Sequence, residues 1–223
     1  MRKMETNNLI FEDYTNAPYF DKLFYYVDEQ EPDILNVFKM SELPSKWKVE
    51  IIPFEEFKRI MDEEYHGYED YMAGHADGTN RIIRVLNVED QIKFTKHKEA
   101  TIESLQKQLV HEFVHACYDE VVGSKNIIQW FSEGLATYLS HQDREFKDIS
   151  DTDFNLLLNN FNATHGKGYT PAYLMERYIF ENYSEDEIYK LISEPSYLAQ
   201  KTSSIINESV EWIKEQIGIR TKK

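Results

Sequence analysis

The stretch that decides the fold and chemistry of this 223-residue chain is His111-Glu112-Phe113-Val114-His115, an H-E-x-x-H pattern. Residues four positions apart on an α-helix project from the same face, so His111 and His115 can both reach one metal ion. Glu112 lies roughly 100° around the helix from His111, beside the histidines. The pattern therefore predicts a helix that carries two metal ligands and, next to them, a carboxylate that does not bind the metal.

A second stretch supplies a third ligand. It reads Trp130-Phe131-Ser132-Glu133-Gly134-Leu135-Ala136 and places Glu133 at the centre of another expected helix. Two imidazoles and one carboxylate form the ligand set of a zinc site with an open fourth position, where the metal lowers the pKa of water towards neutrality. The alternative is an ordinary buried cluster of histidine and glutamate without a metal.

The residues around the histidines predict a buried helix. Thr101 is the expected N-cap, and Gly123 is the expected residue at which the helix stops. One apolar stripe runs along it, formed by Ile102, Leu105, Leu109, Phe113 and Ala116. Histidines inside such a helix need polar partners, and a metal ion is the simplest one. Asp119, one turn after His115, is either an acceptor for a ligand imidazole or a surface charge.

At these residues the chain resembles a known family. H-E-F-V-H-A followed by W-F-S-E-G-L-A-T-Y is similar to the gluzincin metallopeptidases, in particular the peptidase-MA-like and aminopeptidase-N-like branch. The resemblance spans roughly residues 45 to 190. It implies a zincin-like fold in which His111, His115 and Glu133 bind Zn²⁺ and Glu112 is the catalytic base.

A later segment extends the resemblance. Tyr169-Thr-Pro-Ala-Tyr-Leu-Met-Glu-Arg177 resembles the family's Y-x-K-G-A-x-V-I-R stretch, whose first tyrosine stabilises the oxyanion. This implies a catalytic role for Tyr169, with Tyr173 as its rival. Pro171 and Ala172 stand where the family has lysine and glycine. The G-x-M-E-N motif of the aminopeptidases has no match in residues 70 to 100, so aminopeptidase activity is not implied.

Composition narrows the remaining choices. The net charge of −15 argues against nucleic acid and anionic membranes as partners. Cys117 is the only cysteine, which excludes an intramolecular disulfide and Cys-rich zinc modules. No apolar run approaches membrane-spanning length, and no signal peptide is recognisable at the N-terminus. These features lead us to expect a cytoplasmic enzyme.

The pattern of elements predicts an α+β protein with strands early and helices late. We expect residues 1–223 to form a single zincin-like catalytic domain, with an α/β lobe over residues 1–100, built on a small mixed sheet, and a helical lobe over residues 101–223. The individual expectations are a helix over 18–40 interrupted at Pro32, a strand Trp47–Ile52, a helix from Pro53 to Glu64, a turn at Asp77-Gly78, a strand Arg81–Val88, a capped helix Ser184–Ile192 and a helix Ser204–Ile217 ended by Gly218.

The strand Arg81–Val88 has two interpretations. In the family that the chain resembles, the strand just before the metal helix is a sheet edge that binds extended substrate through its main chain. An ordinary internal strand is equally compatible with these residues.

The leading hypothesis for function is a zinc-dependent peptidase, with a peptide or protein as substrate. Glu112 would deprotonate a zinc-bound water, and zinc and the Tyr169 hydroxyl would polarise the peptide carbonyl. Two alternatives remain open. One is a catalytically silent protein of gluzincin fold that uses zinc as a binding module, and the other is a zinc hydrolase of a non-peptide amide.

Overall fold

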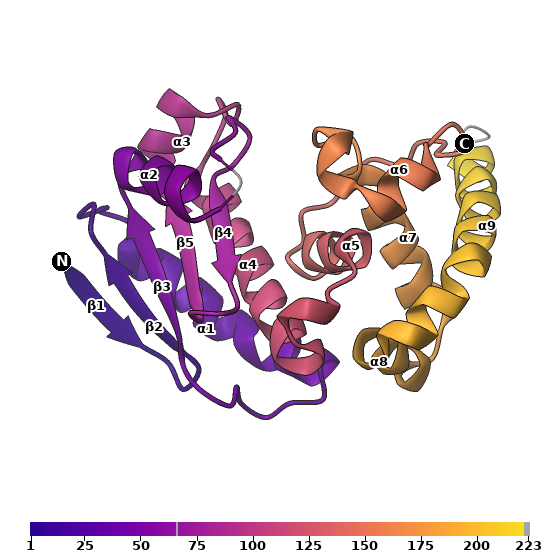
Figure 1. Ribbon diagram of the computed structural model, residues 1–223, viewed down its shortest axis with the longest axis horizontal. Helices are drawn as coiled ribbons and strands as arrows, with labels where there is room; N and C mark the ends of the chain where they lie inside the picture. The colour runs from indigo at the N-terminus through magenta and orange to yellow at the C-terminus, as the bar shows by residue number, and fades with distance from the viewer. Residues whose placement is uncertain (66, 221–223) are drawn as a thin grey trace. The chain divides into compact units, whose positions relative to one another are not determined.

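The computed structural model describes residues 1–65 and 67–220, and it divides the chain into two compact units, Met1–Glu120 and Val121–Lys223. The first contains all the strands of the described chain and the second only helices, so the α+β class expected from the sequence is confirmed (Figure 1). The boundary expected after residue 100 differs from the one observed. The helix that carries the histidines stays with the sheet almost to its end.

A five-stranded mixed sheet forms the centre of the first unit. The strand order is β1-β2-β3-β5-β4; β2, β3 and β5 are parallel to one another, whereas β1 and β4 are antiparallel to their neighbours. The strands are β1 (Arg2–Glu5), β2 (Leu9–Asp13), β3 (Trp47–Ile52), β4 (Gly74–Asp77) and β5 (Ile82–Leu86). The predicted strand Trp47–Ile52 is confirmed residue for residue, whereas β1, β2 and β4 were not predicted.

The strand before the histidine helix is therefore not a sheet edge. β5 pairs with β3 on one side and with β4 on the other, so its main chain already bonds to neighbours on both sides. The edge interpretation of Arg81–Val88 is wrong because the short strand β4 takes the outer position. Any edge binding of an extended chain on this side of the sheet belongs to β4.

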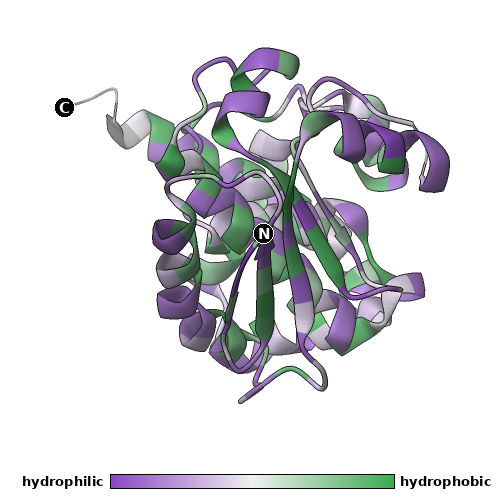
Figure 2. Ribbon diagram, turned by 90° about the vertical axis from the view of Figure 1, so that its left-hand side faces the viewer, coloured by the Kyte–Doolittle hydropathy of each residue, from purple (hydrophilic) through white to green (hydrophobic). Residues whose placement is uncertain are grey.

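Successive side chains along each strand point to opposite faces of the sheet (Figure 2). Val49, Ile51, Ile83 and Val85 point to one face and are buried. Phe11 on β2 meets Phe24 of helix α1 (Phe20–Val37), with ring centroids 5.3 Å apart. Trp47 donates from Nε1 to Glu120 on helix α4 (Ile102–Val122), so α1 and α4 cover this face.

Helix α1 continues through Pro32 without the predicted interruption. Proline removes one backbone hydrogen bond of the helix. However, Val27 before it and Ile34 and Leu35 after it are all buried, and this packing holds the two halves as one helix. The predicted break was wrong because it considered only the hydrogen bond lost at Pro32 and not the packing of the residues on either side.

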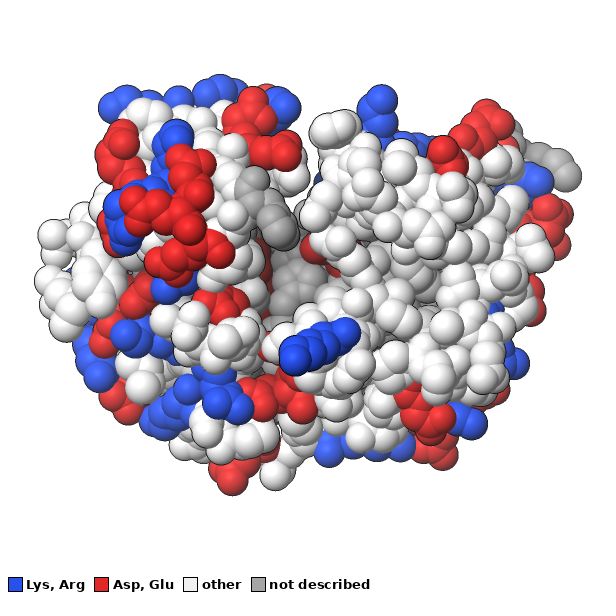
Figure 3. Space-filling view, in the orientation of Figure 1, with Lys and Arg blue, Asp and Glu red and all other residues white. Residues whose placement is uncertain are grey.

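Helix α2 (Phe54–Glu64) starts after Pro53 as predicted and covers the other face of the sheet at its end. Phe57, Ile60 and Met61 pack with Ile52 and Leu86. On its exposed side Arg59 pairs with Glu56, at 2.8 Å between nitrogen and oxygen. Such pairing of opposite charges recurs over the surface of this unit, where acidic and basic side chains lie next to one another (Figure 3).

The second unit is a packed set of helices. Its α-helices are α5 (Gln129–Leu139), α6 (Phe154–Asn159), α7 (Tyr169–Asn182), α8 (Glu185–Ser193) and α9 (Pro195–Arg220). The predicted capping box at Ser184 is present, with Glu187 as its partner. The C-terminal helix is longer than predicted, because it begins at Pro195 instead of Ser204 and continues through Gly218. Short 3₁₀ turns, Ser124–Asn126 and Phe161–Thr164, and helix α3 (Val88–Phe94) complete the described chain.

No helix within the described residues is both long and apolar enough to cross a membrane.

Candidate metal centre

Helix α4 orients the two histidines as the sequence predicts. Thr101 caps the helix, since its side chain accepts a hydrogen bond from the backbone N–H of Ser104 at 3.1 Å. At the other end Gly123 adopts φ 74°, the left-handed conformation that glycine accepts without strain. His111 and His115 then follow one another by one turn, and their imidazole rings lie 4.7 Å apart.

The two imidazoles approach each other through their Nε2 atoms. Nε2 of His111 and Nε2 of His115 are 3.0 Å apart. Nitrogens that bind one tetrahedral metal ion at about 2.05 Å each lie about 3.3 Å apart. The observed separation is close to this value, so a small relaxation lets both imidazoles bind the same ion.

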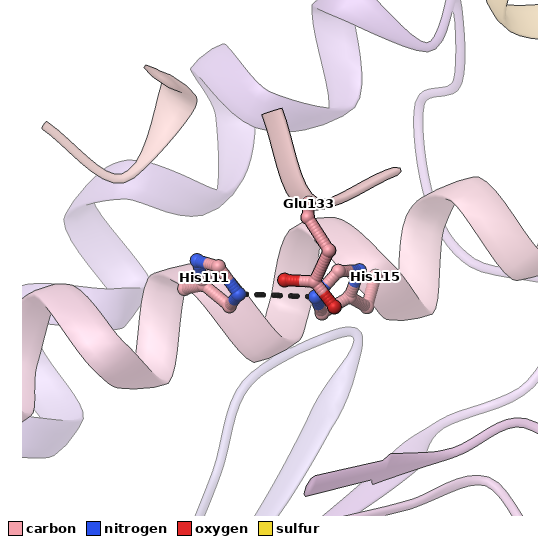
Figure 4. A group of neighbouring side chains, drawn as sticks. All are labelled: His111, His115 and Glu133. Atoms are coloured by element: carbon pink, nitrogen blue, oxygen red, sulfur yellow. Dashed lines mark hydrogen bonds between the residues drawn. The ribbon is translucent and has the colours of Figure 1, made fainter. Parts of the chain in front are cut away.

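Glu133 of helix α5 completes the group. One ligand atom from each of His111, His115 and Glu133 lies within 4.8 Å of the others, and the three form a group able to hold a metal ion (Figure 4). His111 is buried, whereas His115 and Glu133 are half-buried. Two nitrogens and one oxygen form the donor set that zinc prefers at sites with an open position.

Glu112 follows His111 on helix α4 and is buried close to strand β4. It is 7% exposed, and a Cβ added at Gly74 on strand β4 would lie 2.6 Å from its Oε1 and 2.7 Å from Nε2 of Gln108. The carboxylate therefore sits against the edge strand of the sheet. Gly74 was not predicted as a site residue, because the strand that contains it was not predicted either.

Gln108 is itself held in place. Its Oε1 accepts a hydrogen bond of 2.8 Å from Nε2 of Gln91, and the same nitrogen donates to the carbonyl of Leu86 at 3.0 Å. Gln91 is buried on helix α3. This chain of contacts ties the surroundings of Glu112 to the end of strand β5.

The two candidate tyrosines have different surroundings. Tyr169 is the first residue of α7, is half-buried, and lies edge to face with Phe161 at 5.3 Å between ring centroids. Tyr173 is buried, and its hydroxyl donates to Asp143 at 2.9 Å. Burial, with a further contribution from Asp143, raises the pKa of the Tyr173 hydroxyl. The hydrogen bond to Asp143 therefore already engages the Tyr173 hydroxyl.

Two further residues of the histidine helix are buried. Cys117 is fully enclosed, and burial raises the pKa of its thiol well above the ordinary value, so the thiol is inert. Asp119 is 8% exposed, so its interpretation as a surface charge is wrong.

No protein-family profile matches this chain, and no curated protein is similar enough to count as a relative.

Proposed function

We propose that this chain is a zinc-dependent peptidase of the gluzincin type. The observation that carries the proposal is the convergence of His111, His115 and Glu133 within 4.8 Å, with Glu112 on the same helix as the histidines. A metal site with a purely structural role needs no carboxylate next to an open coordination position. A peptidase needs one as a base.

The metal would supply Lewis acidity, because a zinc ion held by these three residues polarises a carbonyl oxygen and lowers the pKa of water. Glu112 would accept a proton from the water that attacks the peptide carbonyl carbon. The same carboxyl would then give the proton to the amine nitrogen as the C–N bond breaks. Tyr169 is proposed to donate a hydrogen bond from its hydroxyl to the carbonyl oxygen as negative charge develops there.

Strand β4 is proposed to hold the substrate. It is the outermost strand of the sheet on the side where Gly74 meets Glu112. A substrate in extended conformation would add to this edge through main-chain hydrogen bonds. That placement brings a peptide bond alongside the base.

The proposal is tested by the variant Glu112→Gln. The amide keeps the size of the side chain and removes its basicity, so hydrolysis of a peptide substrate is expected to fall about 10²- to 10⁴-fold while zinc content stays unchanged. Glu103→Gln makes the same change at an exposed position of α4 and is expected to leave kcat unaltered. Cleavage by Glu112→Gln at the wild-type rate would exclude the mechanism.

The same assay separates the two alternatives. A wild-type protein that binds zinc and cleaves no member of a diverse peptide library supports the binding module with a gluzincin fold. Cleavage confined to small non-peptide amides supports the other alternative. Both outcomes retain the metal site and remove the peptidase activity.

A further inference from the structure

Gly74 stands at the point where strand β4 meets the carboxylate of Glu112. A Cβ at this position would lie 2.6 Å from Glu112 Oε1, 2.7 Å from Gln108 Nε2 and 3.2 Å from Glu112 Cδ. Carbon and oxygen atoms that are not bonded pack at about 3.5 Å. The space that any other residue would fill with its Cβ is therefore filled here by two polar side chains of helix α4.

Strand β4 cannot move away to make room for a side chain. Gly74 pairs with Val85 in the antiparallel ladder between β4 and β5. Just before it, the carbonyl of Ala73 accepts a hydrogen bond of 2.9 Å from the N–H of Leu86. Moving the strand far enough to bring a Cβ at residue 74 into ordinary contact distance of the Glu112 carboxylate would break these hydrogen bonds.

Helix α4 is fixed as well. Gln91 anchors Gln108 from α3, and Glu120 accepts a hydrogen bond of 2.9 Å from Trp47 Nε1 and one of 2.7 Å from Arg81 Nε. The backbone on both sides is thus held, and so is Gln108, which leaves the carboxylate end of the Glu112 side chain as the part that has to shift. Adding one methyl group at residue 74 would displace the Glu112 carboxylate and leave the fold in place.

We propose that Gly74 is a positioning residue: the lack of a side chain at this position of β4 allows the Glu112 carboxylate to occupy its working position beside the metal-binding histidines. The proposal rests on the proposed function, in which Glu112 is the base. Gln108, held by Gln91, bounds the same space from the other side. A larger residue at position 74 removes the base from its place without removing a metal ligand.

The test compares Gly74→Ala with Gly218→Ala, the same substitution at a place where a Cβ would meet no heavy atom of the described residues within 4 Å. For each variant we would measure zinc affinity, thermal unfolding, kcat and KM on a peptide cleaved by the wild type, and the crystal structure. Misplacement of a catalytic group by about 1 Å costs roughly 10²-fold in rate. Gly74→Ala is expected to lose 10- to 100-fold in kcat, with KM, zinc affinity and unfolding temperature close to wild type.

Crystal structures provide the readout that does not depend on activity. In Gly74→Ala the Glu112 carboxylate is expected away from its wild-type position, with β4 and α4 unmoved. Finding the carboxylate in its wild-type position, or kcat equal to wild type, would overturn the proposal. Should the wild type cleave no peptide, the peptidase function fails, and the position of the carboxylate in the variant still decides whether Gly74 sets it.

Discussion

Two glutamates of this chain pack against glycines, one in each unit. The two contacts differ in which neighbouring atoms occupy the space that a Cβ would take. At Gly74 in the first unit, an added Cβ would meet the carboxylate end of Glu112. At Gly134 in the second unit, it would lie 2.7 Å from the carbonyl oxygen of Ala172 and 2.7 Å from Cγ of Glu176. The first glycine makes room for a carboxylate, and the second for the backbone of a neighbouring helix.

The difference separates a glycine that serves a site from one that serves packing. The flexible end of a side chain can move at small cost, whereas a helix backbone cannot. We therefore expect alanine to lower kcat at Gly74 and to lower the free energy of unfolding at Gly134. Neither oxygen of Glu176 has a hydrogen-bond partner within the described chain, and its side chain is fully buried. Such a group contributes a pH-dependent cost to stability.

The largest expected effect concerns Glu176. Burial raises the pKa of its carboxyl well above the ordinary value of 4.5. The folded state therefore keeps the proton that the unfolded state loses, so stability is complete below about pH 4.3 and declines as the pH rises towards the folded pKa. Glu176→Gln removes this loss. Above about pH 4.3 the stability of the variant should therefore rise relative to wild type as the pH rises, by at most about 1.4 kcal/mol per pH unit.

Urea unfolding at a series of pH values measures this effect. The two proteins should have similar stability near pH 4 and diverge above it. Parallel curves over the whole range would show that folding does not raise the pKa of Glu176.

The next effect concerns Gly134. Alanine there places a methyl group against the backbone of α7, and overpacking of this kind costs typically about 1–3 kcal/mol. Part of that cost is offset by the better helix propensity of alanine, about 1 kcal/mol. We expect Gly134→Ala to lower the free energy of unfolding by about 1 kcal/mol. A variant as stable as wild type would mean that α5 and α7 separate easily, and Gly134 would then resemble Gly74.

Local signals in the sequence were sufficient for the histidine helix. Thr101, Gly123 and the spacing of His111 and His115 act within one helix, and the structure has each as expected. The capping box at Ser184 succeeded for the same reason. Glu133 was placed by its own motif, and the structure brings it to the histidines.

Features that depend on distant parts of the chain were not predictable. Strand β4 reads Gly-His-Ala-Asp, which lacks the β-branched and aromatic residues typical of strands, and only pairing with β5 makes it one. Because β4 takes the outer position, β5 is not the edge strand that one interpretation of the sequence had proposed. The contact of Gly74 with Glu112 depends on that pairing, so no local sequence pattern around residue 112 predicts it.

The central claim is that His111, His115 and Glu133 bind one zinc ion, and metal content tests it most directly. Elemental analysis would compare freshly purified wild type, His115→Ala and His97→Ala, the last altering an exposed histidine. We predict one zinc per chain in the wild type and in His97→Ala, and far less than one in His115→Ala, because two ligands hold the ion much less tightly than three. Equal zinc in all three proteins, or none in any, would contradict it.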